Sequence, residues 1–337
     1  MEKTEKPWTE LHRHLDISAR TSTVLELAKK QGLEPQSSSL ESFRKKLILA
    51  KPMTDLDSVL AQFKLFQQIF DTVETFERIG FEVVEDCWNE GIHKAELRFS
   101  PSFACQYNGL SWTQALEGFK KGLNKALNKY SQMQAGLICI ATRDYGPDIV
   151  GRTVEFFLDN RDSFIGFDLA GTESRFSMKA FETVFQPLRD SKANITVHAG
   201  ESTGPETIWQ AIENLGAKRI GHGITSVQDS SLLKYLSEKQ ICLEICPTSN
   251  WLTQCVKTLG EHPLPRILRA GVPVSINTDD PGMFAVSLGH EINICRQQMG
   301  LSDAEIERCR LAADKASFLM KPDSRTTSSP LKNPKIA

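Results

Sequence analysis

Apolar residues along this chain alternate between two kinds of spacing. Short runs rich in β-branched and other apolar residues are typical of buried strands, and most are followed by a stretch in which apolar residues recur with helical spacing. Eight strands are predicted on this basis, at residues 9–15, 94–99, 135–141, 164–169, 194–198, 219–222, 241–245 and 273–277. Amphipathic helices are predicted between them, for example at residues 111–130, 205–215 and 229–239.

Strands that alternate with helices favour a parallel sheet. Eight such units predict a single (β/α)8 TIM-type barrel, which the length of 337 residues allows. An open doubly wound sheet is the alternative, but no G-x-G-x-x-G follows the first strand. We assign residues 1–320 to the barrel domain. Residues 321–337 are rich in Pro, Ser, Thr and Lys, which predicts a disordered polar tail.

The connection between the first two predicted strands, from Asp16 to about His93, is too long for one helix. It contains an apolar stripe at helical spacing that begins with the residues Leu56, Val59, Leu60 and Phe63. One interpretation is a helix that faces the core. The other is a lid over the barrel mouth, because long insertions after a barrel strand lie at the catalytic face.

Composition excludes several classes of function. The formal net charge is −2, so there is no basic surplus for binding nucleic acid or an anionic membrane. The polar N-terminus has no apolar segment of a signal peptide, and no apolar run is long enough to span a bilayer. The eight cysteines form no C-x-x-C and are predicted to be reduced thiols. We therefore expect a cytoplasmic protein.

Histidines occur where predicted strands end. His12 and His14 lie two apart in the first strand and therefore project from the same side. His198 ends the fifth strand and His222 lies at the exit of the sixth. In a barrel these strand ends meet at one face. We interpret the other three histidines, His93, His262 and His290, as structural or exposed.

Carboxylates complete this pattern. Glu201 follows His198 after two small residues, and the adjacent Asp279 and Asp280 follow the eighth strand, where a cation would relieve their repulsion. A turn or helix cap is the alternative role for the Asp-Asp-Pro-Gly run. Three imidazoles and a carboxylate suit zinc better than magnesium or calcium. Zinc lowers the pKa of bound water to about 7, which generates a nucleophile for an electrophilic carbon.

Seven motifs, HRHLD, ELRFSP, DLAGTE, TVHAGE, RIGHG, PTSN and SINTDDPG, occur in this order between Leu11 and Leu319. In this order and spacing the chain resembles the adenosine deaminase family of the amidohydrolase superfamily. The resemblance implies a (β/α)8 barrel with one zinc ion per chain. It also implies hydrolytic deamination of adenosine and 2′-deoxyadenosine to inosine or deoxyinosine and ammonia, in purine salvage. The expected partner is a small-molecule purine nucleoside.

The resemblance also implies roles for individual residues. The metal ligands would be His12, His14, His198 and Asp279. Glu201 would protonate N1 of the purine, while His222 and Asp280 would hold and deprotonate the attacking water. The substrate would contact His14, Asp16, the backbone N–H of Gly171, and Asp280, with Asp16 on the ribose side. The lid positions would be Leu56, Val59, Leu60 and Phe63.

Two positions depart from the family pattern and affect the expected substrate range. Ile17 stands where a glycine is common, and Thr172 stands where an acid is common. A free-base adenine deaminase and a deaminase of 5′-modified adenosine therefore stay open as alternatives. AMP is disfavoured, since Arg20 is the only nearby cation and Asp16 would repel a phosphate. A non-catalytic purine-binding module is a further alternative. The H-x-E…P-C-x-x-C pattern of other zinc deaminases is absent.

Overall fold

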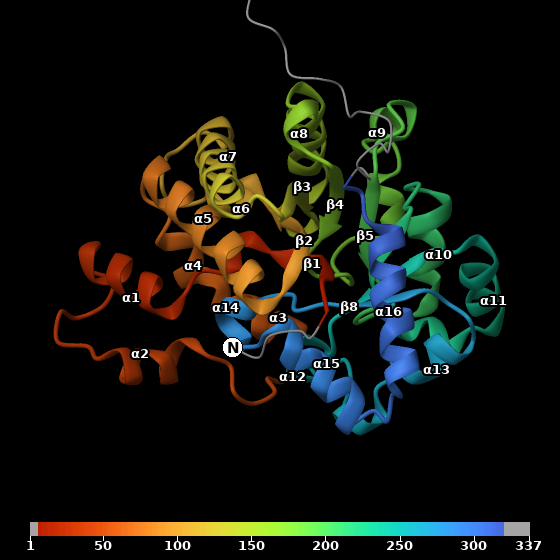
Figure 1. Cartoon of the computed structure of the whole chain (residues 1–337). Helices are drawn as coiled ribbons and strands as arrows, with labels where there is room; N and C mark the ends of the chain where they lie inside the picture. Colours follow the sequence, from red (N-terminus) through yellow and green to blue (C-terminus); the bar gives the residue numbers. More distant parts are fainter. Residues whose placement is uncertain (1–5, 320–337) are drawn as a thin grey trace, which may run out of the picture.

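The structure is a computed structural model that describes residues 6–319 (Figure 1). Eight parallel strands are hydrogen-bonded in sequence order from β1 to β8. They are β1 (Trp8–His14), β2 (Ile92–Phe99), β3 (Gln134–Thr142), β4 (Gly166–Ala170), β5 (Ile195–Ala199), β6 (Arg219–His222), β7 (Cys242–Ile245) and β8 (Val274–Ile276). The predicted (β/α)8 barrel is confirmed, and each strand lies within a few residues of its predicted position.

The barrel closes between its last and first strands just beyond the end of β8. Arg13 and Asp279 form an isolated parallel bridge. The N–H of Asp279 donates to the carbonyl of His12 at 2.9 Å, and the N–H of His14 donates to the carbonyl of Asp279 at 2.8 Å. Closure therefore brings the end of β1 directly beside the aspartate pair.

Helices cover the outside of the strands (Figure 1). Those after β2 are α6 (Pro101–Ala104), α7 (Trp112–Lys129), α8 (Gly146–Asp159), α9 (Gln186–Asp190), α10 (Pro205–Glu213), α11 (Ser230–Lys239), α12 (Pro247–Leu252), α13 (Leu264–Arg269), α14 (Pro281–Phe284), α15 (Leu288–Gln297) and α16 (Asp303–Ala316). Capping residues in the sequence set where helices begin. At the start of α7, for example, Ser111 forms a capping box with Gln114. Most buried apolar residues form one large hydrophobic core, and Leu11, Cys242 and Ala313 form a separate small cluster.

The connection after β1 folds into several helices instead of one. It contains α1 (Thr21–Lys30), α2 (Leu40–Leu47), α3 (Leu56–Leu60), α4 (Lys64–Gln68) and α5 (Val73–Glu90), with short 3-10 turns at Leu15–Ile17 and Ala61–Phe63. The predicted apolar stripe is divided by burial. Val59, Phe66 and Phe70 are buried, whereas Leu56, Leu60 and Phe63 are half-buried.

Three further sequence predictions concern the cysteines, membrane-spanning segments and the C-terminal tail. All eight cysteines lie in the described part of the chain and are free thiols, as predicted. Within residues 6–319, every helix is too short or too polar to cross a lipid bilayer. The proposed polar tail at residues 321–337 lies outside the described residues.

Candidate active site and metal centre

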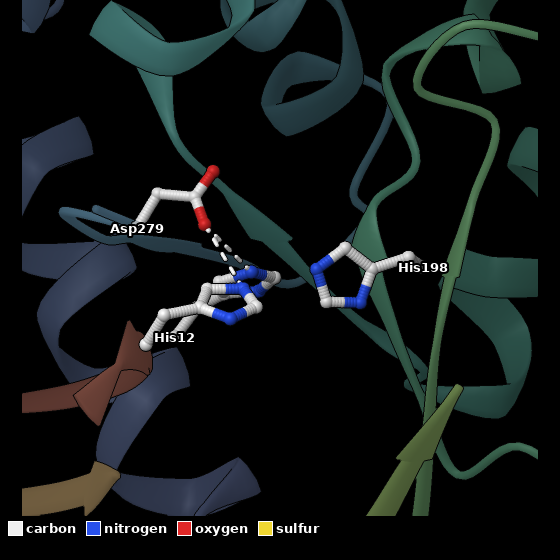
Figure 2. Close-up of side chains that lie close together, drawn as sticks. His12, His198 and Asp279 are labelled. Carbon is white, nitrogen blue, oxygen red and sulfur yellow. Dashed lines mark ion pairs between the residues drawn. The ribbon is translucent and has the colours of Figure 1, made fainter. Parts of the chain in front are cut away.

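The predicted metal ligands come from three strand ends and meet at one face of the barrel. His12 and His14 project from β1, His198 from β5, and Asp279 lies just beyond β8. Figure 2 shows His12, His198 and Asp279 pointing toward a common centre. One ligand atom from each of the four residues lies within 4.8 Å of the ligand atoms of the other three. Three of the four residues are buried and His14 is half-buried.

Hydrogen bonds fix which nitrogen of His12 and of His198 faces the centre. His12 Nδ1 lies 2.9 Å from Glu244 Oε2, and His198 Nδ1 lies 3.1 Å from Asp168 Oδ1. A carboxylate accepts hydrogen bonds, so both Nδ1 atoms carry the proton and both Nε2 atoms present a lone pair. This carboxylate–histidine arrangement is the one found around zinc ligands.

The acceptor atoms of the cluster are arranged as if around a cation. The buried Nε2 of His12 has no hydrogen-bond partner. It lies 3.3 Å from Asp279 Oδ1, and His14 Nε2 lies 3.2 Å from the same oxygen. With His12 Nδ1 already protonated, a bare lone pair faces a carboxylate oxygen. Two acceptors this close repel each other unless a positive charge lies between them.

A second possible ligand set comprises His12, His222, Cys246 and Asp279. It shares two residues with the first set, so one metal ion cannot use both sets fully. In the first set, carboxylates hold Nδ1 of both His12 and His198, as is usual for zinc ligands, whereas in the second set Nδ1 of His222 faces the amide of Asn250. The set of three histidines and an aspartate therefore describes the centre better.

A buried arginine joins the two supporting carboxylates. Arg98 Nη1 donates to Asp168 at 2.8 Å, and its Nη2 donates to Glu244 at 2.7 Å. All three side chains are fully buried. Glu244 also accepts from Arg219 Nε at 2.7 Å. One guanidinium thus connects the supports of His12 and His198.

Two site residues have unusual backbone conformations. His222 and Asp279 have φ values of 60° and 62°, in the left-handed region that non-glycine residues rarely adopt. Such strain is concentrated at functional sites, where the surrounding structure holds it in place. Here it turns His222 toward the cluster, with Nε2 at 3.7 Å from Asp279 Oδ2 and 3.6 Å from Glu201 Oε2.

Glu201 is buried beside the cluster, in surroundings that favour the protonated carboxyl group. Burial raises the pKa of its carboxyl well above the ordinary value, and the nearby Asp279, Glu173 and Asp280 raise it further. Glu173 also fixes the local backbone. Its carboxylate accepts hydrogen bonds from the backbone N–H groups of Glu201, Ser202 and Thr203 at 2.9–3.2 Å. The loop that carries Glu201 is thereby held rigid.

Asp16 and Asp280 each leave one buried carboxylate oxygen without a partner, Oδ1 in both cases. The other oxygen of Asp16 accepts the Ser100 N–H at 3.0 Å. Burial raises the pKa of Asp16 to about 6. Burial and the adjacent Asp279 raise the pKa of Asp280 well above its ordinary value. A bound cation would lower the pKa of Asp280 and restore its charge.

Two neighbouring cavities, which share His14 and Gly171 as lining residues, adjoin the cluster. The inner one, of about 50 Å³, is lined by site residues that include His14, His198, Glu201, His222, Asp279 and Asp280. The outer one, of about 610 Å³, is lined by Asp16, Ile17 and Gly171, among others. Gly171 adopts φ 101°, and a Cβ there would lie 1.9 Å from Asp144 Oδ2. Only glycine fits at this point of the wall.

The four predicted lid residues, Leu56, Val59, Leu60 and Phe63, all line the inner cavity. Phe63 also packs edge-to-face on Phe103, with ring centroids 6.1 Å apart. Thr172 Oγ1 donates to Asp57 Oδ1 at 2.8 Å, which ties α3 to the loop after β4. One departure from the family pattern, Thr172, therefore contacts α3. The other, Ile17, is 1% exposed and belongs to the wall of the outer cavity.

Comparisons with known proteins agree with this geometry. The family model described as adenosine deaminase matches residues 7–333. An adenosine deaminase from Escherichia coli is 37% identical over 322 residues, which cover 96% of each chain. This chain belongs to the adenosine deaminase family. The family resemblance seen in the motifs is confirmed, and the chain is a hydrolase of this family.

Solved structures share the fold of this adenosine deaminase family member. An adenine deaminase from Arthrobacter aurescens superposes with a TM-score of 0.86 at 24% identity, covering 95% of both chains. An N6-mAMP deaminase from Arabidopsis superposes with a TM-score of 0.80 at 29% identity, covering 93% of this chain and 94% of that one. These neighbours differ in the substrates that their names state, so the fold alone does not select the substrate.

Some site residues of this family member were not singled out from the sequence. Arg98 and Asp168 lie within the ELRFSP and DLAGTE motifs, but the motifs alone do not show which carboxylate supports which histidine. Glu244 carried a clearer signal, because a charged residue inside an otherwise apolar strand has to be paired. Glu173 and Asn250, which lie in the DLAGTE and PTSN motifs, showed no such signal.

Proposed function

We propose that this protein is a zinc-dependent deaminase that converts adenosine and 2′-deoxyadenosine to inosine or deoxyinosine and ammonia, with one zinc ion per chain. The observation that carries the proposal is the buried, proton-favouring Glu201 beside a cluster of three histidines and Asp279. Attack at C6 of a purine breaks the aromatic ring, and a proton delivered to N1 receives the displaced electrons. A carboxyl group that keeps its proton near neutral pH is suited to this step.

The metal would be held by His12, His14, His198 and Asp279. When bound, zinc supplies a Lewis acid that lowers the pKa of water to about 7. His222 and Asp280, which also line the inner cavity, would hold and deprotonate the attacking water. The unpartnered Oδ1 of Asp280 is a free acceptor for the water's proton. The N–H of Gly171 would donate to N3 of the purine.

Asp16 favours a nucleoside over a nucleotide. Its unpartnered Oδ1 is an acceptor in the wall of the outer cavity, where a ribose hydroxyl can satisfy it. Besides Asp16, the carboxylates of Asp57 and Asp144 line that wall. Among the described residues that line it, Arg175 is the one cation, and it already lies 3.6 Å from Asp144. A phosphate would meet more negative than positive charge.

Arg20, the other cation considered for a phosphate, is already paired. Its guanidinium lies 2.6 Å from Asp86 and 2.8 Å from Glu85. It lines a different cavity, which it shares with Arg13 and His290. This placement supports adenosine as the substrate and disfavours AMP.

We propose that α3 and the turn after it form the lid. Their apolar side chains line the inner cavity, where they would exclude water from the bound purine. Ile17 adds apolar surface to the outer wall, which narrows the sugar site.

Ammonia release from adenosine tests this function. The zinc-loaded protein should release ammonia and form inosine, and the activity should be lost on chelation and return with zinc. His198→Ala should lose zinc and activity together, whereas His290→Ala, an exposed histidine in the other cavity, should keep both. Full turnover by a His198→Ala variant without metal would refute the assignment.

A further inference from the structure

His222 is the last member of a buried chain of polar groups that leads away from the active site. Its Nδ1 lies 3.0 Å from the side-chain amide Nδ2 of Asn250. The amide Oδ1 of Asn250 lies 3.2 Å from Nε2 of His262. At the far end, the backbone N–H of Leu264 donates to Nδ1 of His262 at 3.0 Å. His222, Asn250 and His262 are 1%, 0% and 4% exposed, so water does not compete for these bonds.

The hydrogen bond from Leu264 to His262 determines which group donates in each of the other hydrogen bonds. A backbone N–H can only donate, so Nδ1 of His262 must present a lone pair to Leu264. A neutral His262 then carries its proton on Nε2 and donates it to Asn250. That bond fixes the oxygen of the Asn250 amide toward His262 and its NH2 group toward His222. Burial lowers the pKa of His262 to about 3, so the ring is neutral at physiological pH.

We propose that Asn250 and His262 are positioning residues that hold His222 as a neutral imidazole with its proton on Nε2. The proposal rests on the function proposed above and assigns His222 a narrower role within it. Nδ1 of His222 accepts from Asn250, so the only proton of the ring lies on the nitrogen that faces the inner cavity.

This polarity decides what His222 can do for the attacking water. Its Nε2–H can donate a hydrogen bond to the water oxygen and orient one oxygen lone pair toward C6. It cannot take up a proton at Nε2, which is already protonated. A proton on Nδ1 would face the NH2 group of Asn250, donor against donor, in a buried site. Of the two residues that hold the water, Asp280 is therefore the one that removes its proton.

Defined secondary-structure elements hold Asn250 and His262 in place. Asn250 lies in the middle of α12, where its backbone N–H donates to the carbonyl of Cys246 at 3.0 Å. His262 directly follows the turn Leu259–Glu261 and precedes α13. The sequence had suggested a structural or exposed role for His262. It is buried, and it lies two hydrogen bonds from the active site.

Nitrogen NMR on the zinc-loaded enzyme with 15N-labelled histidine tests the proposal directly. The resonances of His222 are identified by their loss in a His222→Asn variant. We expect an unprotonated Nδ1 and a protonated Nε2 for His222, and the same pattern for His262. A protonated Nδ1 on His222 would overturn the proposal. This measurement needs no substrate, so it does not depend on whether adenosine is the substrate.

Asn250→Asp supplies the functional test, because it keeps the shape but replaces a donor by an acceptor. We expect the His222 proton to move to Nδ1, zinc to stay at one equivalent, and kcat to fall on the order of 10²–10⁴-fold with a smaller change in KM. A wild-type kcat, or a loss of kcat with the His222 proton still on Nε2, would refute the positioning role. If the variant does not fold, the wild-type spectrum decides.

A matched pair at His262 separates hydrogen bonding from packing. His262→Gln can still donate to Asn250 and should keep most of the activity. His262→Phe fills a similar space without a donor, and it frees the Asn250 amide to rotate. We expect a lower kcat and a mixed protonation pattern for His222 in His262→Phe. Equal kcat and identical His222 spectra in the two variants would show that His262 only fills space.

Discussion

Asp279 is joined to His12 by both its backbone and its side chain. Its N–H donates to the carbonyl of His12 at 2.9 Å, and its Oδ1 lies 3.3 Å from His12 Nε2. The first contact closes the barrel, and the second belongs to the proposed metal centre. Closure of the fold and assembly of the centre therefore use the same pair of residues.

This coupling predicts that the metal stabilises the whole barrel. A ligand that binds only the folded state adds about 4 kcal/mol when present at 1,000 times its Kd. We expect the protein to unfold at a clearly lower temperature after a chelator has removed its zinc than when it is zinc-loaded. Calcium or magnesium should not restore the higher unfolding temperature, because both prefer oxygen ligands. Equal unfolding temperatures with and without zinc would contradict the coupling.

Asp168→Asn tests the support of the proposed metal ligand His198. The amide keeps the shape but loses the charge that faces both His198 and Arg98. We expect zinc affinity to fall about 10–100-fold, as for other outer residues of metal sites. Competition with a calibrated chelator measures it. Asp159→Asn, at an exposed position of α8, is the matched control and should bind zinc as the wild type does.

The sequence predicted the fold well, and for a physical reason. Buried parallel strands are short apolar runs, and helices show their own period, so both kinds of element can be read locally. The clustering of His12, His14, His198 and Asp279 could be predicted because strand ends converge in a barrel. The link from His262 through Asn250 to His222 could not, since it joins three segments whose side-chain contacts depend on the packing of α12 and α13. The division of the apolar stripe between core and cavity depended on packing in the same way.

Glu201→Gln tests the proton donor. The amide keeps the shape of the carboxyl group but cannot deliver its proton. We expect zinc to stay bound at one equivalent while kcat falls by about 10²–10⁴-fold or more. Metal analysis and steady-state kinetics on the same preparation measure both. Loss of zinc together with loss of folding would show that Glu201 has a structural or ligating role instead.

The lid is tested by two phenylalanines of the same segment. Phe63 is half-buried and lines the inner cavity, whereas Phe66 is fully buried in the core. We expect Phe63→Ala to raise KM for adenosine at a modest loss of stability. Phe66→Ala should destabilise the protein by about 3–5 kcal/mol with KM unchanged in the folded fraction. The reverse pattern would place Phe63 in the core and leave α3 without a lid function.

A comparison of substrates tests whether the site accepts a purine nucleoside. We would measure kcat/KM of the zinc-loaded enzyme for adenosine, 2′-deoxyadenosine, adenine, AMP and 5′-methylthioadenosine. A site built to pair with a hydroxyl rejects analogues that lack it, and Asp16 offers such an acceptor. We expect adenosine and 2′-deoxyadenosine to be good substrates, with adenine and AMP poorer by on the order of 10²-fold or more. Faster turnover of adenine or AMP than of adenosine would contradict it.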